Sequence, residues 1–232
     1  MNVLVITTSY TFPGAARPLA GRFFGVLVRH MREHGASCTV VCPTAYVPRL
    51  LSARLGRMLP KYERWEGVEI YRPRYLSLRL KRRLGWQARS FCLSAMPACQ
   101  RLHRRRRFEA VVGYGFCMPA FTAAAVARRL GLPSASWAIG SDVNTCPTLS
   151  RGNARLVVRN VRTNDLVLTE SVALRRTLME QAPNAGNIHT YYKGIELGPL
   201  ARPPDRFRLR ARLGLRADRR YMVSVGWAVQ AK

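Results

Sequence analysis

A short polar run carries the clearest chemistry in this sequence. The residues Gly140-Ser141-Asp142-Val143-Asn144 follow, after Ile139, a segment, 133–138, that has a strand pattern. They place a serine hydroxyl and an aspartate carboxylate beside a glycine, whose backbone no side chain covers. Such a set can orient sugar hydroxyls or take up a proton. A structural role is equally consistent, because Asp142 or Asn144 can form an Asx turn or cap a helix. The residues leave both interpretations open.

Two further loops follow segments with strand patterns, at residues 9–20 and 193–200. The first leads into a helix pattern and lacks the closely spaced glycines and the later acidic residue of a dinucleotide-binding fingerprint, which argues against a nicotinamide enzyme. It can hold an anion at the helix N-terminus, or it can simply be a connection with glycines for its turns.

The elements that must position these loops alternate between strand and helix along the chain. This alternation predicts a Rossmann-like, doubly wound α/β fold with a mainly parallel sheet, whose ligands bind at the carboxyl ends of the strands. The predicted strands are 2–8, 37–42, 67–72, 109–113, 133–138, 165–169 and 187–192. The predicted helices are 21–34, a short one at 48–58, 119–130, and one capped by Ser171.

The formal net charge of +27 over 232 residues is the strongest compositional signal. With 35 Arg and 4 Lys it partly reflects an Arg-rich background, and no recognition-helix or aromatic RNA-binding motif accompanies it. We therefore expect no nucleic-acid partner, and nucleic-acid binding is the weakest alternative.

Two basic stretches, 79–83 and 101–107, bracket an apolar, potentially helical segment, 86–102. They predict either contact with an anionic membrane surface or a solvated basic face.

Cysteine and histidine usage predicts neither disulfides nor a metal site. The six cysteines lie in apolar segments without paired CxxC spacing, so we expect buried free thiols. The four histidines form no metal-binding cluster. The N-terminus has no signal-peptide pattern, and no apolar run is long enough to span a membrane. These features predict a cytoplasmic protein.

The C-terminal residues predict a second domain. Residues 221–232 have the pattern of a buried strand and a glycine turn with no helix after them, and a Pro-rich segment, 197–205, precedes the last helix pattern. We expect one domain over residues 1–200, and a linker, a helix and the first strand of a truncated second domain over residues 201–232.

Taken in order, these segments resemble the family-4 retaining glycosyltransferases of GT-B architecture, especially bacterial members that act in cell-surface polysaccharide biosynthesis. Seven short motifs occur in the order of that family: Val3–Thr7 with Tyr10; Pro18–Phe24; Gly35–Pro43; Arg128–Pro133 leading to Gly140–Asn144; Asn164–Leu174; Tyr191–Leu197; and Val225–Lys232.

The resemblance implies transfer of a sugar from a nucleotide-sugar donor to a glycan or lipid-linked acceptor, with retention and with neither a cofactor nor a required metal. The first domain would bind the acceptor, peripherally on the inner membrane face where lipid-linked acceptors reside, and the truncated second domain would bind the donor. The implied catalytic residues are Asp142 and Ser141. The implied substrate-binding residues are Tyr10, Arg17, Gly21, Phe23, Gly140, Asn144 and Glu196, and the implied donor-phosphate residues are Gly226 and Lys232.

The chain departs from the family pattern at likely polar contacts. Ile139 stands where relatives often carry His or Arg, and Trp227 replaces the Arg of the second-domain turn. Lys193 and Glu196 replace a hinge Asn and Asp. These changes support an alternative, in which the chain is a catalytically inactive acceptor-binding remnant of a truncated gene.

Overall fold

The computed structural model describes residues 1–8, 22–46, 59–77, 83–192, 205–216 and 218–222, with only the backbone described at 22–24. The chain divides into two units, Met1–Tyr192 and Lys193–Lys232. The second unit contains helix α8, Arg206–Arg212, whose first turn is capped by the Asp205 carboxylate, which accepts a 2.9 Å hydrogen bond from the Phe207 N–H. The expected domain boundary at 200/201 lies outside the described residues.

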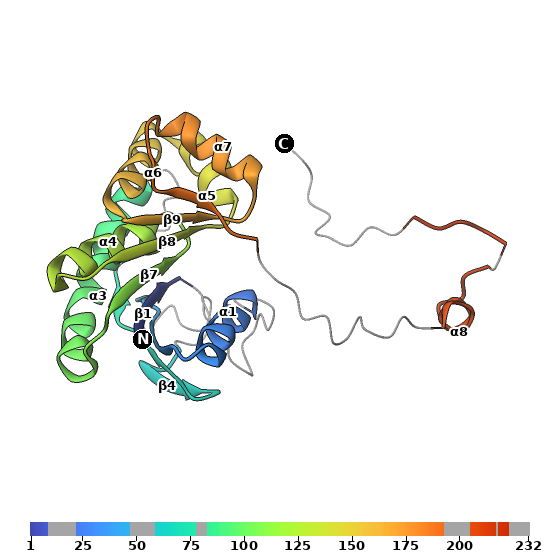
Figure 1. Cartoon of the computed structure of the whole chain (residues 1–232), viewed down its shortest axis with the longest axis horizontal. Coiled ribbons are helices and arrows are strands. Elements are labelled where there is room, and N and C mark those ends of the chain that lie inside the picture. Colours follow the sequence, from blue (N-terminus) through green and yellow to red (C-terminus); the bar gives the residue numbers. More distant parts are fainter. Residues whose placement is uncertain (9–21, 47–58, 78–82, 193–204, 217, 223–232) are drawn as a thin grey trace. The chain divides into compact units, whose positions relative to one another are not determined.

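An eight-stranded sheet forms the centre of the first unit, in the order β10-β9-β8-β7-β1-β2-β5-β4 (Figure 1). All neighbouring strands in it are parallel except β4 and β5. The chain starts in the middle at β1, proceeds towards one edge, and then returns to β7 and proceeds to the other edge. This reversal makes the sheet doubly wound and confirms the predicted Rossmann-like α/β fold. The strands are β1 Asn2–Thr7, β2 Ser37–Val41, β4 Tyr62–Trp65, β5 Val68–Tyr71, β7 Ala110–Tyr114, β8 Ser134–Ala138, β9 Leu166–Thr169 and β10 Ile188–Thr190, with a separate pair β3 Thr44–Ala45 and β6 Arg74–Tyr75.

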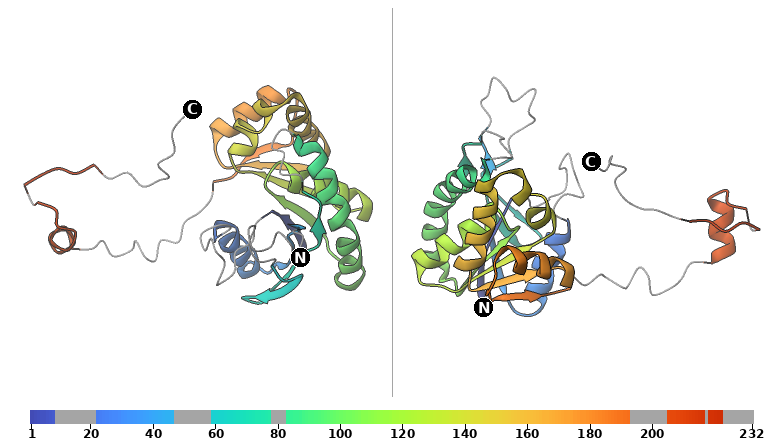
Figure 2. Two further views of the ribbon diagram at one scale, coloured as in Figure 1. Left: turned by 180° about the vertical axis from the view of Figure 1, so that it is seen from behind. Right: turned by 90° about the horizontal axis from the view of Figure 1, so that it is seen from above.

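Helices cover both faces of this sheet (Figures 1 and 2). Helix α1 packs on one face, where Val28 joins Val3 and Val5 of β1 in one buried cluster. Helices α3 and α4 pack on the other face, against Leu4 and Ile6 of the same strand. Burial of β1 on both faces explains why its sequence is a continuous apolar run. The helices are α1 Arg22–Glu33, α3 Leu84–Arg106, α4 Met118–Leu130, α5 Ser141–Asn144, α6 Arg151–Thr163 and α7 Val172–Gln181, with a 3-10 turn, η3, at Pro147–Leu149.

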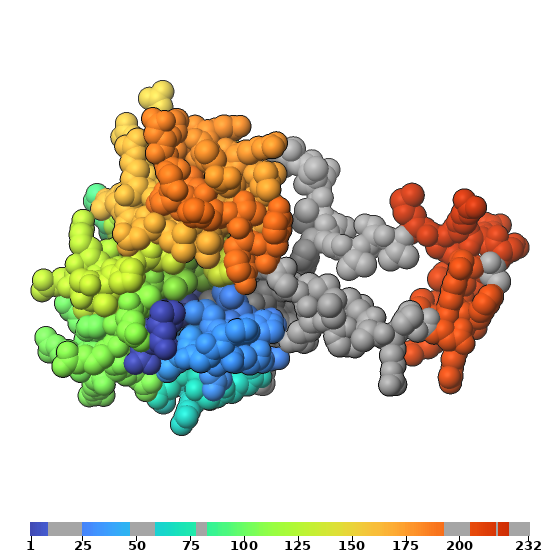
Figure 3. Space-filling model, viewed as in Figure 1, coloured from blue at the N-terminus to red at the C-terminus, as the bar shows by residue number. Residues whose placement is uncertain are grey.

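Helix α4 approaches strand β7 very closely. An added Cβ at Gly113 in β7 would lie 2.8 Å from the carbonyl oxygen of Pro119, which shows that only glycine fits at this position. The face of α4 that packs inward is built from small residues, including Ala120, Ala123 and Ala127, all buried. Residues 110–138 therefore form a tight βαβ unit. In the space-filling view it belongs to a closely packed body that also contains the N-terminal strand and α1 (Figure 3).

Several elements were missing from the prediction. Helix α6 begins at a Ser150 cap, whose hydroxyl accepts a 3.2 Å hydrogen bond from the Asn153 N–H. Strand β4 forms a hairpin with β5 through Glu66 and Gly67, which both have positive φ, at 48° and 75°. Its polar sequence lacks a strand signal, whereas the Glu-Gly turn suits a tight hairpin. The short strands β3 and β6 were also not predicted, and the helix predicted at 48–58 lies outside the described residues.

Candidate functional site

The carboxyl ends of β7 and β8 lie side by side, and Asp142 joins the two loops that follow them. Its Oδ2 accepts a hydrogen bond of 2.7 Å from the backbone N–H of Phe116, in the loop after β7. Its Oδ1 accepts one of 2.9 Å from the Gly140 N–H, and the Ile139 N–H lies 3.1 and 3.2 Å from the two oxygens. The carboxylate thus accepts hydrogen bonds from three backbone N–H groups, which belong to two loops.

Position 140 requires glycine because of its backbone conformation, and not because a side chain would collide with a neighbour. Gly140 has φ of 120°, which side chains strongly disfavour, while an added Cβ would meet nothing within 4 Å. This turn directs the chain from β8 into the single turn of helix α5 and carries Ser141 to the surface. The side chains of Ser141 and Asn144 are both exposed, and neither forms a hydrogen bond with the described residues. Both are therefore polar groups of the loop that are open to a ligand.

The Asp142 carboxylate lies in a partly desolvated position. Burial raises its pKa above the ordinary value, and the backbone N–H donors of Phe116, Ile139 and Gly140 oppose this rise by stabilising the charge. The hydrogen bonds support the structural interpretation of Asp142 as a brace between loops. Its catalytic role, and that of Ser141, remain predictions.

Amide side chains from α6 and α7 fix the same two loops from behind. Asn160, fully buried, donates from Nδ2 to the carbonyl oxygens of Phe116 at 2.5 Å and Cys117 at 3.0 Å. Asn153, also fully buried, donates to the Cys146 carbonyl at 3.1 Å, and Gln181 donates to the Val143 carbonyl at 3.1 Å. Sequence reasoning did not identify these residues, because the helix that carries two of them was itself missed.

A row of aromatic rings lies near the carboxyl ends of the strands, on the α1 face of the sheet. The Tyr114 and Trp137 ring centroids are 6.0 Å apart, and Trp137 and Tyr191 meet edge to face at 4.9 Å. Trp137 is 5% exposed, and its buried indole N–H has no hydrogen-bond partner among the described residues, whereas Tyr191 is 46% exposed. The row therefore offers an aromatic surface with an unused donor beneath it. These residues lie far apart in sequence, so their spacing gave no signal.

Most of the other predicted site residues lie outside the described part of the chain. Phe23 belongs to α1, but its side chain is not described. The structure therefore brings together only the predicted residues of the loop after β8. The predicted residues outside the described ranges are Tyr10, Arg17, Gly21, Glu196, Gly226 and Lys232.

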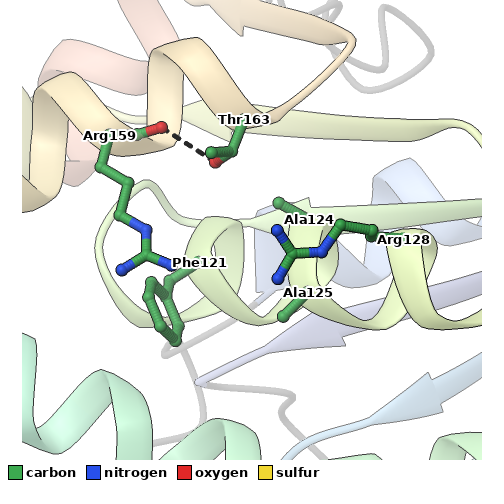
Figure 4. A pocket seen from close by; sticks show the side chains of 6 residues that line it. All are labelled: Phe121, Ala124, Ala125, Arg128, Arg159 and Thr163. Atoms are coloured by element: carbon green, nitrogen blue, oxygen red, sulfur yellow. Dashed lines mark hydrogen bonds between the residues drawn. The ribbon is translucent and has the colours of Figure 1, made fainter.

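A separate cavity of about 190 Å³ lies between helices α4 and α6 (Figure 4). The guanidinium of Arg159 lies 4.8 Å from the centroid of the Phe121 ring, and Arg128 approaches from α4. Neither arginine forms an ion pair within the described residues, so the cavity has a positive lining. It lies between two helices and not at the carboxyl ends of the strands, so we do not assign it to the loop site.

The described ranges contain neither a candidate metal site nor a candidate membrane-spanning helix. No group of three or more His, Cys, Asp or Glu side chains that could hold a metal ion occurs there. None of the helices described is long and apolar enough to cross a membrane.

No family model matches the sequence and no curated protein matches it, but solved structures share its fold. Sucrose-phosphate synthase from Thermosynechococcus elongatus matches with a TM-score of 0.59 and 10% identity, over 92% of this chain and 99% of that one. Anabaena HepE, solved with UDP, matches with a TM-score of 0.56 and 18% identity, over 92% of this chain and 50% of that one. A Polygonum tinctorium UDP-glucosyltransferase that can glucosylate indoxyl matches with a TM-score of 0.51 and 13% identity, over 84% of this chain and 52% of that one.

These likenesses, at such low identity, show the fold. This chain spans about half the length of the HepE and glucosyltransferase chains that it matches. The same fold occurs in a protein solved with UDP and in a UDP-glucosyltransferase.

Proposed function

We propose that this chain is the acceptor-binding part of a retaining, family-4-like GT-B glycosyltransferase. The observation that carries the proposal is the position of the Gly140–Asn144 loop. The motif that resembles the family's central motif lies at the carboxyl edge of the sheet, where ligands of doubly wound folds bind. The shared fold with a UDP-glucosyltransferase and with a UDP-bound protein gives independent support.

In the proposed reaction the bond between the anomeric carbon of the donor sugar and the diphosphate breaks. A bond from the acceptor hydroxyl oxygen to that carbon forms with retention, and the hydroxyl proton leaves with the nucleoside diphosphate. Cationic side chains and backbone N–H groups stabilise the leaving diphosphate, without a required metal. Gly226 and Lys232 are the proposed phosphate contacts, and Asp142 and Ser141 are the proposed groups near the reacting sugar.

The aromatic row is the proposed acceptor platform. Tyr191 presents nearly half of its surface, and Trp137, two residues before Ile139 in the chain, supports it from below. Aromatic faces pack against the apolar side of a sugar ring, and the exposed ring of Tyr191 can provide such a face. A glycan or the saccharide part of a lipid-linked acceptor fits this surface, in agreement with a role in cell-surface polysaccharide biosynthesis.

Peripheral membrane attachment is proposed for the outer side of α3. The apolar side of this helix, including Phe91 and Cys99, is buried in the core and cannot insert into lipid. Its outer side exposes Trp86 (44%) and Leu93 (75%) near exposed arginines, which suits an anionic surface. Flotation with vesicles containing anionic lipid should show binding that weakens with salt, and equal flotation with neutral vesicles would refute the electrostatic part.

A catalytically inactive acceptor-binding protein is the second candidate. The observation in its favour is Ile139, which is 42% exposed at the position where relatives often carry a His or Arg. Such a protein would bind a saccharide acceptor but would not turn over a donor.

The two candidates differ in one experiment. The full product of the gene is incubated with a panel of nucleotide sugars and a lipid-linked saccharide extract, and released nucleoside diphosphate and glycosylated product are measured. Transfer supports the glycosyltransferase. Acceptor binding without transfer or donor hydrolysis supports the inactive protein and overturns the first proposal.

A further inference from the structure

Two cysteine thiols meet beneath the candidate loop. The Sγ atoms of Cys117 and Cys146 lie 3.0 Å apart, although 28 residues separate them in the chain. Cys117 precedes helix α4 in the loop after β7, and Cys146 follows α5 in the loop after β8. A disulfide has sulfurs about 2.0 Å apart, so the two need to approach by only about 1 Å.

The backbone around both cysteines is held in place by one helix. Asn160 and Asn153 of α6 bind the carbonyl oxygens of Cys117 and Cys146 respectively, at 3.0 and 3.1 Å. The Asp142 side chain further ties residue 116 to the loop that ends at Cys146. The short sulfur–sulfur contact is therefore set by packing and buried hydrogen bonds, not by two mobile side chains.

The two sulfurs differ in access and in protonation. Cys117 is partly exposed, whereas Cys146 is 6% exposed. The S–H of Cys117 lowers the pKa of Cys146 by donating to its thiolate, while the same contact and burial raise the pKa of Cys117. The charge of Asp142 opposes ionisation of both. The pair can thus share one proton across the contact, and Cys117 is the more accessible of the two residues.

We propose that Cys117 and Cys146 form a redox-active dithiol site, which a low-molecular-weight disulfide oxidises to an intramolecular disulfide. One cysteine thiolate attacks the reagent disulfide, forming a mixed disulfide and releasing the first reagent thiol. The second cysteine then attacks the mixed disulfide, forming the Cys117–Cys146 bond and releasing the second reagent thiol. Two electrons and two protons pass from the protein to the reagent, so one reagent disulfide yields two thiols.

Oxidation would change the candidate site directly. The new bond would pull Cys146, two residues after α5, towards the start of α4. A displacement of about 1 Å near a reacting group can lower a rate on the order of 100-fold. We expect transfer by the oxidised protein to fall at least about tenfold and to recover on reduction. This part rests on the proposed glycosyltransferase function, whereas formation of the disulfide does not.

Peptide mapping tests the site without any assay of activity. The reduced full chain is exposed to oxidised glutathione under native conditions, remaining thiols are alkylated, and tryptic peptides are analysed by mass spectrometry. Cleavage after arginine yields peptides 108–128 and 130–151, each with a single cysteine, Cys117 and Cys146. We expect these two peptides to be linked by a reducible bond, with the other four cysteines alkylated.

Matched variants sharpen the outcome. Cys117→Ser and Cys146→Ser should each abolish the linked peptide, while Cys92→Ser should leave it intact. Absence of the linked peptide in the unaltered chain, or equal linkage among other cysteines, would overturn the proposal. If the link forms but no transfer occurs in either redox state, the proposed function fails and the dithiol site stands. If transfer is active and unaffected by the link, the regulatory part is overturned.

Discussion

Replacement of Asp142 by asparagine tests whether this carboxylate braces the two loops. An amide keeps the size of the side chain but offers one acceptor oxygen in place of two, and its NH2 group would face backbone donors. The Phe116 N–H, now 2.7 Å from Oδ2, is the donor left without an acceptor. A buried donor without a partner costs roughly 1–3 kcal/mol, so we expect Asp142→Asn to lower the free energy of unfolding by about 2 kcal/mol.

The corresponding shift in melting temperature follows from the size of the folded unit. Unfolding entropy of about 2.1 cal/mol/K per residue gives about 0.4 kcal/mol/K for Met1–Tyr192, so a loss of about 2 kcal/mol lowers Tm by about 5 °C. Differential scanning calorimetry measures this shift. Ser141→Ala is the matched control in the same loop, because the exposed Ser141 hydroxyl forms no hydrogen bond with described residues, and its Tm should change by less than about 1 °C. An unchanged Tm for Asp142→Asn would refute the bracing role.

Three further predictions concern the core, the acceptor surface and pH. Gly113→Ala should destabilise the chain by about 2 kcal/mol in urea unfolding through overpacking, whereas Gly85→Ala, with open space around its Cβ, should cost nothing; equal effects would contradict the close approach at residue 113. Tyr191→Ala should weaken acceptor binding about fivefold in calorimetry, while the more exposed Tyr192→Ala should not, and a reversed order would exclude the platform. The hydrogen bonds of Asp142 and its titration contribute separately to stability. Because burial raises the pKa of Asp142, the pH-dependent part of its contribution is complete below the unfolded pKa of about 3.9 and is lost as pH rises through the folded pKa. The Tm gap to Asp142→Asn should therefore widen on acidification, and a constant gap would contradict that shift.

The elements most readily predicted from sequence were those with simple local signals. The apolar run of β1, the helix end before Gly131, with its φ of 69°, and the Ser171 cap, whose hydroxyl accepts a 3.1 Å bond from Leu174 N–H, are all local features. Helix α6 has an equally good cap at Ser150, but the preceding loop and its many arginines obscured its apolar face. The polar strand β4 is stabilised by pairing with β5, and no local pattern in the sequence of β4 predicts this pairing.

The site was predicted only as far as its residues lie close in sequence. Glycine, serine and aspartate in one run were sufficient to identify the loop after β8. The two roles predicted for Asp142, a substrate contact or a turn or cap, involved only residues of that run. The bond from Phe116 to Asp142, the buried amides of α6 and the contact between Cys117 and Cys146 join segments that fold from distant parts of the chain. Such contacts depend on the sheet order, so they become visible only with the three-dimensional structure.

Glycosyl transfer is the central claim, and the most direct measurement is product formation by the full product of the gene. With a panel of nucleotide sugars and lipid-linked saccharide acceptors, we predict release of nucleoside diphosphate that depends on the acceptor, together with a product heavier by one sugar residue and with the anomeric configuration of the donor retained. The complete absence of transfer and of donor hydrolysis with every nucleotide sugar, by protein that is shown to be folded, would contradict the claim.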